Sequence, residues 1–281
     1  MKEILLEAIL DSLKILPFLF IVFLLMEYFE HKLSKKAKKT VEKSGKYGPI
    51  IGGLLGAFPQ CGFSVAATNL YAARIITFGT LVAIYLSTSD EMIPILLSNN
   101  VNVSLIFKIV GIKVIIAIIF GFIIDLIFRT KKEAKDHIHD ICEEEHCGCE
   151  KNIFLSTIKH TINIISFIFI ANFVLNTIIH FIGPDALSNF LMKNTFLEPV
   201  FTSLLGLIPN CASSVIITEL YLTNSISFGA MLAGLLTGSG VALVVLFKVN
   251  KNIKDNLKVL CTIYFIGVIV GIILNIFKFA V

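Results

Sequence analysis

The chain has 281 residues, of which 56% are hydrophobic and 16% are charged, and its formal net charge is +4. Soluble domains average about 45–50% apolar and about 25% charged residues. This composition excludes a disordered chain, a nucleic-acid-binding protein and an ordinary soluble enzyme. It predicts an all-α polytopic membrane protein.

Apolar segments follow one another along the chain and are separated by polar loops. A helix that spans a bilayer needs about 20 apolar residues. The first segment is too long for a signal peptide, so we interpret it as a spanning helix. The segments of the first half cover residues 4–29, 48–73, 75–98 and 104–128, and those of the second half cover residues 153–182, 196–222, 226–247 and 258–279.

The two halves of the chain have similar sequences. Residues 54–71 align without a gap on residues 204–221, and ten of these eighteen pairs are identical. Chance similarity between apolar segments would not keep Pro, Cys and Gly in one register, so the match indicates an internal duplication. We predict a first repeat over residues 1–130, a linker over 131–150 and a second repeat over 151–281.

The second segment of each half is interrupted at its centre by a Pro-x-Cys sequence, with Pro59 and Cys61 in the first half and Pro209 and Cys211 in the second. Proline cannot continue the hydrogen-bond ladder of a helix. The segment therefore crosses the membrane as a broken helix, or it enters and leaves on one side as a re-entrant hairpin.

The distribution of basic residues favours the hairpin, because Lys and Arg prefer cytoplasmic loops. With a hairpin, each half crosses the membrane three times, and the basic loops 31–47, 129–151 and 248–258 all lie inside. An odd number of crossings makes the halves inverted repeats, each with three spanning helices and a re-entrant hairpin, or about ten helices in total. The protein is then expected in the plasma (inner) membrane, with both termini outside and the linker 129–151 in the cytoplasm.

Inverted repeats with interrupted helices are typical of secondary transporters, whose binding site lies near the bilayer midplane. Irregular backbone at that depth must be buried or line a cavity, so we expect the two breaks to face each other. Thiolates prefer soft or borderline ions such as Cu(I) and Zn, although a cysteine at a tight turn also packs well without a ligand. The residues predicted to contact substrate are Pro59, Gln60, Cys61, Ser64, Asn210, Cys211, Ser213, Ser214, Ser87, Ser89, Thr237 and Ser239.

The third segment of each half has a polar centre, at residues 87–91 and 237–240, which we interpret as an unwound stretch of helix. Two adjacent carboxylates, Asp90 and Glu91, lie in the first of these centres, within the apolar third segment of the first half. Charged groups inside a membrane are energetically costly and mark ion paths or proton relays. We predict that these two residues and Glu219, in the second hairpin, carry coupling protons, and that Asp90 and Glu91 also contact the metal. Lys113, alone in the fourth segment, is expected to extend its amine toward a membrane surface.

The linker combines His, Cys and carboxylate residues within a short tract, a composition typical of metal binding. Its spacing differs from that of a closed zinc finger, so we expect a flexible site that holds metal before export and not merely a solvated acidic linker. The predicted ligands are His137, His139, Cys142, His146, Cys147 and Cys149.

These features together resemble the ten-helix heavy-metal exporter family, which includes arsenic-efflux and manganese-transporter-like permeases. The resemblance covers essentially the whole chain and implies an efflux permease for a metal or metalloid ion, without identifying the ion. The residues that carry it are those of the duplicated Gly-x-x-Pro-x-Cys break: Gly56, Pro59 and Cys61, and Gly206, Pro209 and Cys211.

The sequence therefore predicts a secondary-active transporter, not an enzyme. Its cargo is manganese, held by oxygen ligands, or a soft heavy metal or arsenite, held by Cys61 and Cys211. The chain has no nucleotide-binding motif, and no cofactor besides the transported ion and a coupling proton is expected. The expected partners are the ion and the lipid bilayer, with no nucleic acid, and a homo-oligomer is compatible with the sequence.

Two alternatives stay open. Helix N-termini at hairpin tips bind anions, so the substrate is alternatively a small organic or oxyanion solute. The equivalent cysteines Cys61 and Cys211 are also compatible with a transmembrane thiol–disulfide carrier, which needs accessible thiols of low pKa.

Overall fold

The computed structural model describes residues 47–58, 61–89, 92–128, 153–182, 197–210 and 212–277, with scattered residues between 9 and 24. All regular elements within these ranges are α-helices. The described residues include four stretches that are long and apolar enough to cross a bilayer, namely Phe78–Ser98, Val103–Ile127, Phe228–Val249 and Ile253–Ile276. The prediction of an all-helical polytopic membrane protein is confirmed.

The predicted interruptions divide the apolar segments into pairs of shorter helices. The first half contains α3 (Gly48–Gly56), α4 (Cys61–Ala72), α5 (Phe78–Ser87), α6 (Met92–Ser98) and α7 (Val103–Ile127). The second half contains α9 (Ile153–Ile182), α11 (Glu198–Gly206), α12 (Ala212–Leu222), α13 (Phe228–Thr237), α14 (Ala242–Val249) and α15 (Ile253–Ile276). The second and third segments of each half are thus both broken.

The chain reverses direction between α3 and α4. A Cβ atom placed on Gly48 would lie 2.1 Å from Thr80 Oγ1, and one placed on Gly56 would lie 2.1 Å from Ser87 Oγ. Helices α3 and α5 therefore run side by side in the same direction. The intervening helix α4 must return to the end at which α3 begins, which is the reversal expected of a hairpin.

The second half has the same arrangement. Glu198, at the start of α11, accepts hydrogen bonds from the backbone N–H and the hydroxyl of Ser227, at 3.3 and 2.6 Å, just before α13 begins. At the other end of these two helices, a Cβ atom on Gly206 would lie 2.3 Å from Thr237 Oγ1. Helices α11 and α13 are therefore parallel, and α12, which follows α11 in the chain, runs in the opposite direction.

Helices α5 and α13 form the core. All their residues are buried, and each packs between two helices of its own half: α5 between α3 and α7, and α13 between α11 and α15. The halves also exchange contacts, because α4 packs against α14 while α12 packs against α6. Glycines where α5 meets α3 and α7, and where α13 meets α11 and α15, let the helix backbones approach closely, as is common in membranes. The core therefore joins the two halves.

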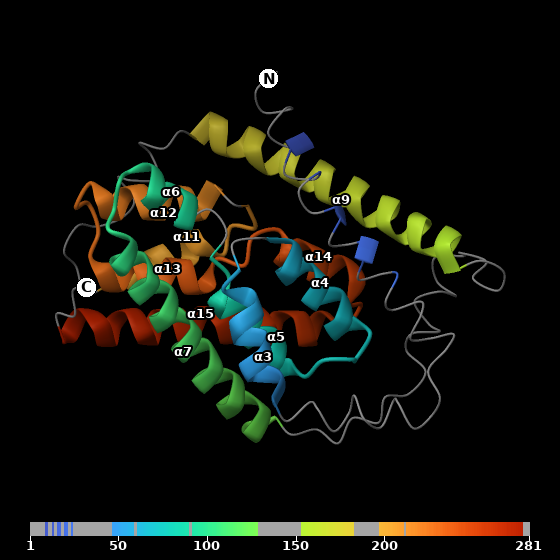
Figure 1. Ribbon diagram of the computed structural model, residues 1–281, viewed down its shortest axis with the longest axis horizontal. Helices are drawn as coiled ribbons and strands as arrows, with labels where there is room; N and C mark the ends of the chain where they lie inside the picture. The colour runs from blue at the N-terminus through green and yellow to red at the C-terminus, as the bar shows by residue number, and fades with distance from the viewer. Residues whose placement is uncertain are drawn as a thin grey trace.

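Helix α9 lies along one edge of the molecule (Figure 1). Its Phe154 ring makes an edge-to-face contact with Phe20 of the first segment, at 5.7 Å between ring centres. The Lys248 amine, at the end of α14, donates a 3.1 Å hydrogen bond to the Asn163 carbonyl of α9. Most of the predicted first spanning segment lies outside the described residues.

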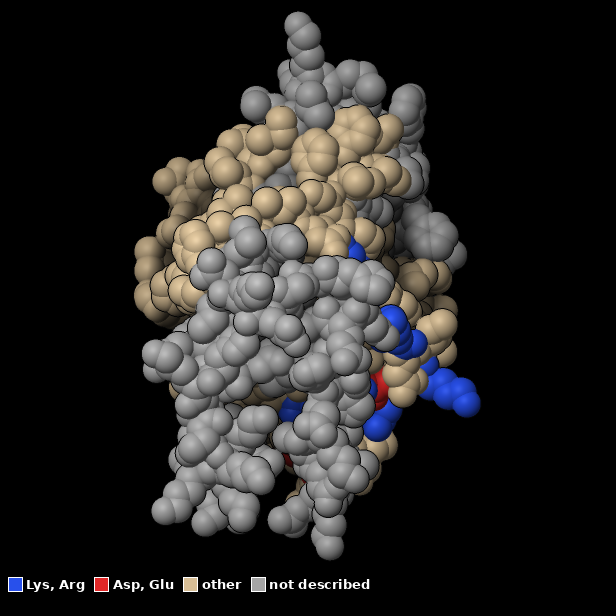
Figure 2. All heavy atoms as spheres, turned by 90° about the vertical axis from the view of Figure 1, so that its right-hand side faces the viewer, with Lys and Arg blue, Asp and Glu red and all other residues tan. Residues whose placement is uncertain are grey.

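Segments of both halves meet at one end of the molecule. The Lys258 amine, near the start of α15, lies 4.7 Å from the ring centre of Phe78 and 3.5 Å from that of Phe128. Arg74, just after α4, pairs with Asp255 at 3.0 Å. In Figure 2 the visible charged side chains lie mostly in the lower half of the face, while the described surface above them consists of other residue types.

Candidate functional site

Hydroxyl side chains terminate α5 at its break. The backbone N–H and the hydroxyl of Thr88 both donate to the Ile84 carbonyl, at 3.0 and 2.7 Å, and the Ser87 hydroxyl donates to the same oxygen at 3.1 Å. The Ser89 hydroxyl donates to the Ser87 carbonyl at 3.0 Å. These short polar side chains replace the backbone donors that a continuous helix would supply, so the helix stops inside an apolar segment.

Glycine and threonine terminate α13 at the equivalent position. The Thr237 hydroxyl donates to the Ser203 carbonyl of α11 at 2.9 Å, which fastens the end of α13 to the hairpin. The chain then passes through Gly238 to Gly240, whose φ of 55° lies in the left-handed region. Glycine adopts this conformation without the steric penalty that a Cβ atom brings. The turn leads directly into α14.

The tip of the second hairpin is held by side chains of its own sequence. The Asn210 side-chain oxygen accepts a 2.9 Å hydrogen bond from the backbone N–H of Ala212, and the Ser213 hydroxyl donates to the Asn210 carbonyl at 2.8 Å. These bonds satisfy groups at the start of α12 that have no partner within the helix. The break therefore has a defined shape.

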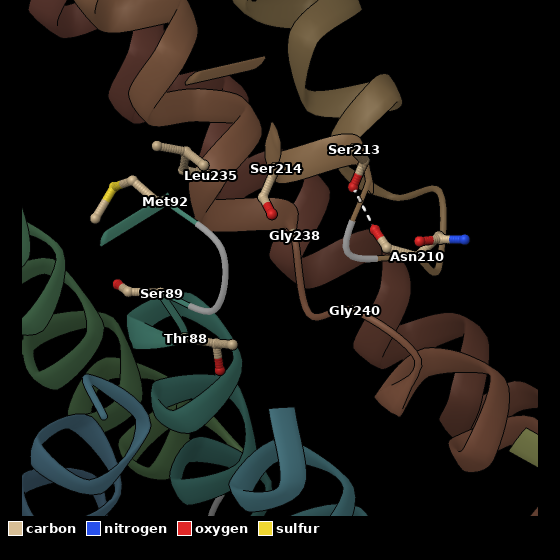
Figure 3. Close-up of a pocket in the computed structure, with 9 residues that line it drawn as sticks. All are labelled: Thr88, Ser89, Met92, Asn210, Ser213, Ser214, Leu235, Gly238 and Gly240. Atoms are coloured by element: carbon tan, nitrogen blue, oxygen red, sulfur yellow. Dashed lines mark hydrogen bonds between the residues drawn. The ribbon is translucent and has the colours of Figure 1, made fainter. Parts of the chain in front are cut away.

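The second hairpin tip and both third-segment breaks line a small pocket that is partly open to solvent. Figure 3 shows the Ser214 hydroxyl pointing into the space between α12 and the two breaks, whereas the Asn210 side chain points away from it. The lining combines hydroxyl and amide side chains with glycines and with the apolar side chains of Met92 and Leu235; its residues are Thr88, Ser89, Met92, Asn210, Ser213, Ser214, Leu235, Gly238 and Gly240.

Four of the predicted substrate contacts line this pocket, and four other described ones do not. Ser64, Ser87, Thr237 and Ser239 are buried, and the Ser239 hydroxyl has no hydrogen-bond partner within the described part of the chain. Glu219, predicted to carry a proton, lies exposed on α12 and does not line the pocket. The predicted residues that do line it are Ser89, Asn210, Ser213 and Ser214.

Several predicted residues fall outside the described ranges. They are Pro59, Gln60, Asp90, Glu91, Cys211 and the linker ligands His137, His139, Cys142, His146, Cys147 and Cys149, and of Cys61 only the backbone is described, as the first residue of α4. Among the described residues, no three His, Cys, Asp or Glu side chains lie close enough together to hold a metal ion. Pro209 is described and lies half-buried in the turn before Asn210.

Sequence reasoning did not find all of the lining. Thr88 and Gly238 were visible as parts of the polar centres, but Met92 and Leu235 resemble ordinary core residues. Gly240 also belongs to the second polar centre and aligns with Asp90 of the first half. No pattern in the sequence distinguishes a Met or Leu beside a helix break from one packed in the core.

The expectation for Lys113 was wrong. Its side chain is fully buried, with no exposed surface, and its amine does not reach a membrane surface. The amine donates to the Thr88 carbonyl and, at 2.9 Å, to the Leu235 carbonyl, and both of these residues line the pocket. A long side chain extends to a surface only when nothing nearer satisfies its charge, and here carbonyl oxygens do so.

Comparison with known protein families agrees with this architecture. The model of the family described as "Putative, 10TM heavy-metal exporter" matches residues 1–183 and residues 151–280. No curated protein and no solved structure matches the chain. The family description is that of a ten-helix membrane exporter, in agreement with the four candidate spans. Because the matched stretches together extend over nearly the whole chain, the protein belongs to this 10TM heavy-metal exporter family.

Proposed function

We propose that this protein is a secondary-active transporter that exports a metal or metalloid ion, and that the ion binds in the pocket between the breaks. One observation carries the proposal: three interrupted elements, contributed by both halves, line the same pocket. Interrupted helices that meet between two repeats form the substrate sites of many secondary transporters.

The residues next to the lining in the sequence supply suitable ligands. Asp90 and Glu91 stand between two lining residues, Ser89 and Met92, and Cys211 directly follows the lining residue Asn210. Carboxylate and hydroxyl oxygens suit manganese, whereas thiolates and a thioether suit soft ions. Both ligand classes therefore belong to the segments that form the pocket.

The two halves are proposed to have opposite orientations in the membrane. Lys258 lies near the start of α15, and it contacts the start of α5 and the end of α7. Arg74, which follows α4, lies at the same end of the molecule because it pairs with Asp255 of α15. The basic loops 31–47, 129–151 and 248–258 all connect to this end, because they precede α3, follow α7 and join α14 to α15. By the preference of Lys and Arg for the cytoplasm, this end faces inward.

A proton gradient is the proposed energy source, with Asp90 and Glu91 as the proton carriers. Glu219 is the weaker candidate of the three because it is exposed on α12. The linker tract is proposed to collect the ion on the cytoplasmic side. Its six His and Cys residues supply nitrogen and sulfur ligands for soft or borderline metals.

The proposal is tested by cellular accumulation of manganese, zinc, copper, cadmium and arsenite in an efflux-deficient host. The wild type is compared with Cys61→Ser/Cys211→Ser and with Asp90→Asn/Glu91→Gln. Cys261→Ser is the matched control, because Cys261 is a free, exposed thiol on α15. The wild type and the control are expected to lower the cellular content of one of these ions.

The variants then identify the chemistry. Loss of export only in the double cysteine variant assigns a soft metal or arsenite, and loss only in the carboxylate variant assigns manganese or proton coupling. If the wild type changes the content of no ion, metal export is refuted. An organic or oxyanion solute would then be tested, as would a thiol–disulfide carrier, the latter by counting free thiols with and without reductant.

A further inference from the structure

The side chain of Lys113, on α7, is fully buried. It lies where the two broken third segments meet. Its amine donates one hydrogen bond to the Thr88 carbonyl of the first half and another, of 2.9 Å, to the Leu235 carbonyl of the second half. An ionisable residue inside a membrane protein is by default a functional candidate. The contacts of this amine indicate which function it has.

Both acceptors belong to helix C-termini. Thr88 is the C-cap of α5, and Leu235 lies in the last turn of α13. The last carbonyl groups of a helix have no partner within it, and the helix dipole adds partial negative charge at that end. Two such ends that converge on one point form a cation site, and transporters with broken helices bind their coupling cations at sites of this kind.

Only one half supplies the amine. The residue that aligns with Lys113 in the second repeat is Ile263, which is also fully buried. The helices packed on α7 offer few charges: α3 and α6 contain no titratable side chain and α5 contains only Tyr85, whose hydroxyl hydrogen bonds with Thr68 at 2.6 Å. Asp90 and Glu91 follow Thr88 in the chain and lie outside the described residues. The amine of this one lysine therefore hydrogen bonds to carbonyl groups at both breaks.

We propose that Lys113 is a tethered cation: its ammonium occupies the position between the ends of α5 and α13 that a free sodium ion would otherwise fill, and it positions both breaks around the pocket. The protein consequently assembles its site without sodium. Removing the amine opens a cation site that a small ammonium ion fills. Only the transport part of the test rests on the proposed function.

The test uses the purified full chain in detergent. Lys113→Ala and the longer, neutral Lys113→Met are compared with Lys108→Ala and Lys108→Met, because Lys108 lies exposed on the same helix. Unfolding temperature is measured in choline chloride, in sodium chloride and with added propylammonium, which has the length of the removed side chain. Reconstituted vesicles then report the rate of metal transport.

The wild type and the Lys108 variants are expected to respond to none of these cations. Lys113→Ala is expected to unfold at a lower temperature in choline, and propylammonium should raise that temperature, because a ligand that binds only the folded state stabilises it. Lys113→Met keeps the apolar stem but leaves two carbonyl groups unpaired, so its transport rate should fall by roughly 10-fold or more.

Two results would overturn the proposal. One is a Lys113→Met variant that transports at the wild-type rate, and the other is a folded Lys113→Ala variant whose stability ignores propylammonium. If the wild type moves no metal but propylammonium stabilises only Lys113→Ala, metal export is refuted while the proposed role of Lys113 stands. The two proposals therefore fail separately.

Discussion

The guanidinium of Arg74 lies 3.0 Å from the carboxylate of Asp255 and ties the end of the first hairpin to the start of the last helix. The same carboxylate accepts hydrogen bonds from the Tyr71 hydroxyl at 2.8 Å and from the Asn250 side chain at 3.2 Å. The aligned positions of the other half, Asn224 and Leu105, cannot form this ion pair. The end of the molecule proposed to face the cytoplasm thus has an inter-repeat connection that its counterpart cannot form.

We expect Asp255→Asn to destabilise the protein more than Arg74→Gln, because Asp255 accepts from three side chains. Both side chains are partly exposed, so the coupling energy between them should be about 1 kcal/mol or less. A double-mutant cycle on the unfolding temperature in detergent measures it. Lys254→Gln, at an exposed position on the same helix, is the control. If the double variant loses no more stability than Arg74→Gln alone, the hydrogen bonds from Tyr71 and Asn250 to Asp255 do not stabilise the protein.

Much of the fold could be predicted from the sequence because its signals are local. Hydropathy gave the bounds of the apolar segments from residue 48 onward to within about five residues, and the duplicated Pro-x-Cys pattern indicated where the second segments break. The polar centres at residues 87–91 and 237–240 indicated breaks in the third segments, now seen between α5 and α6 and between α13 and α14. Helix termination depends on neighbouring side chains, which a sequence displays directly.

The long-range contacts could not be predicted in this way. The exchange of α4 onto α14 and of α12 onto α6 depends on how the halves pack, and no local pattern encodes it. The same holds for Lys113, which looks like an isolated charge in an apolar helix until Thr88 and Leu235 are placed beside it. Hydropathy alone does not distinguish a lysine that faces lipid headgroups from one that faces carbonyl groups in the core.

Close contact between α5 and α7 makes Gly79 intolerant of a side chain. A Cβ atom at this position would lie 2.1 Å from the Gly121 carbonyl oxygen and 2.6 Å from the Asp125 carboxylate. Gly79→Ala must therefore separate the two helices, and overpacking of this kind typically destabilises by about 1–3 kcal/mol. The unfolding temperature of the purified protein should fall.

Gly111→Ala is the matched control on α7, because a Cβ atom there would have no neighbour within 4 Å. Alanine favours a helix over glycine by up to about 1 kcal/mol, so this variant should be as stable as the wild type or slightly more stable. Equal losses in the two variants would show that the α5–α7 contact is looser than the structure indicates.

A side chain at Gly238 should obstruct the pocket without unfolding the protein. Gly238 lines the pocket, its φ is −72°, and the nearest neighbour of an added Cβ atom would be 3.4 Å away. Gly238→Val should therefore keep a near-wild-type unfolding temperature while metal transport in vesicles falls.

Gly240→Ala should behave differently, because its φ of 55° imposes strain of about 1–2 kcal/mol on a residue with a Cβ atom. This variant should lose stability, whereas Gly111→Val, away from the pocket, should leave transport unchanged. Full transport by Gly238→Val would exclude the pocket from the path of the ion.

The position of Lys258 between Phe78 and Phe128 predicts which loops share a side of the membrane. We expect Cys147, in the linker, to lie inside and loop 183–195, beyond the other end of α9, to lie outside. With every other cysteine replaced by serine, Cys147 should react with a membrane-impermeant maleimide only after the cells are permeabilised. In a variant that lacks all native cysteines, Ser188→Cys should react in intact cells.

The two labels distinguish the possible errors. Exchange of the two results would keep the three crossings of each half but reverse the orientation, so the basic loops would lie outside against the usual preference of Lys and Arg. Labelling of both positions from the same side would mean that α9 does not cross the membrane as a single span. The halves would then not be related by inversion, and the proposed ion site between inverted repeats would lose its structural basis.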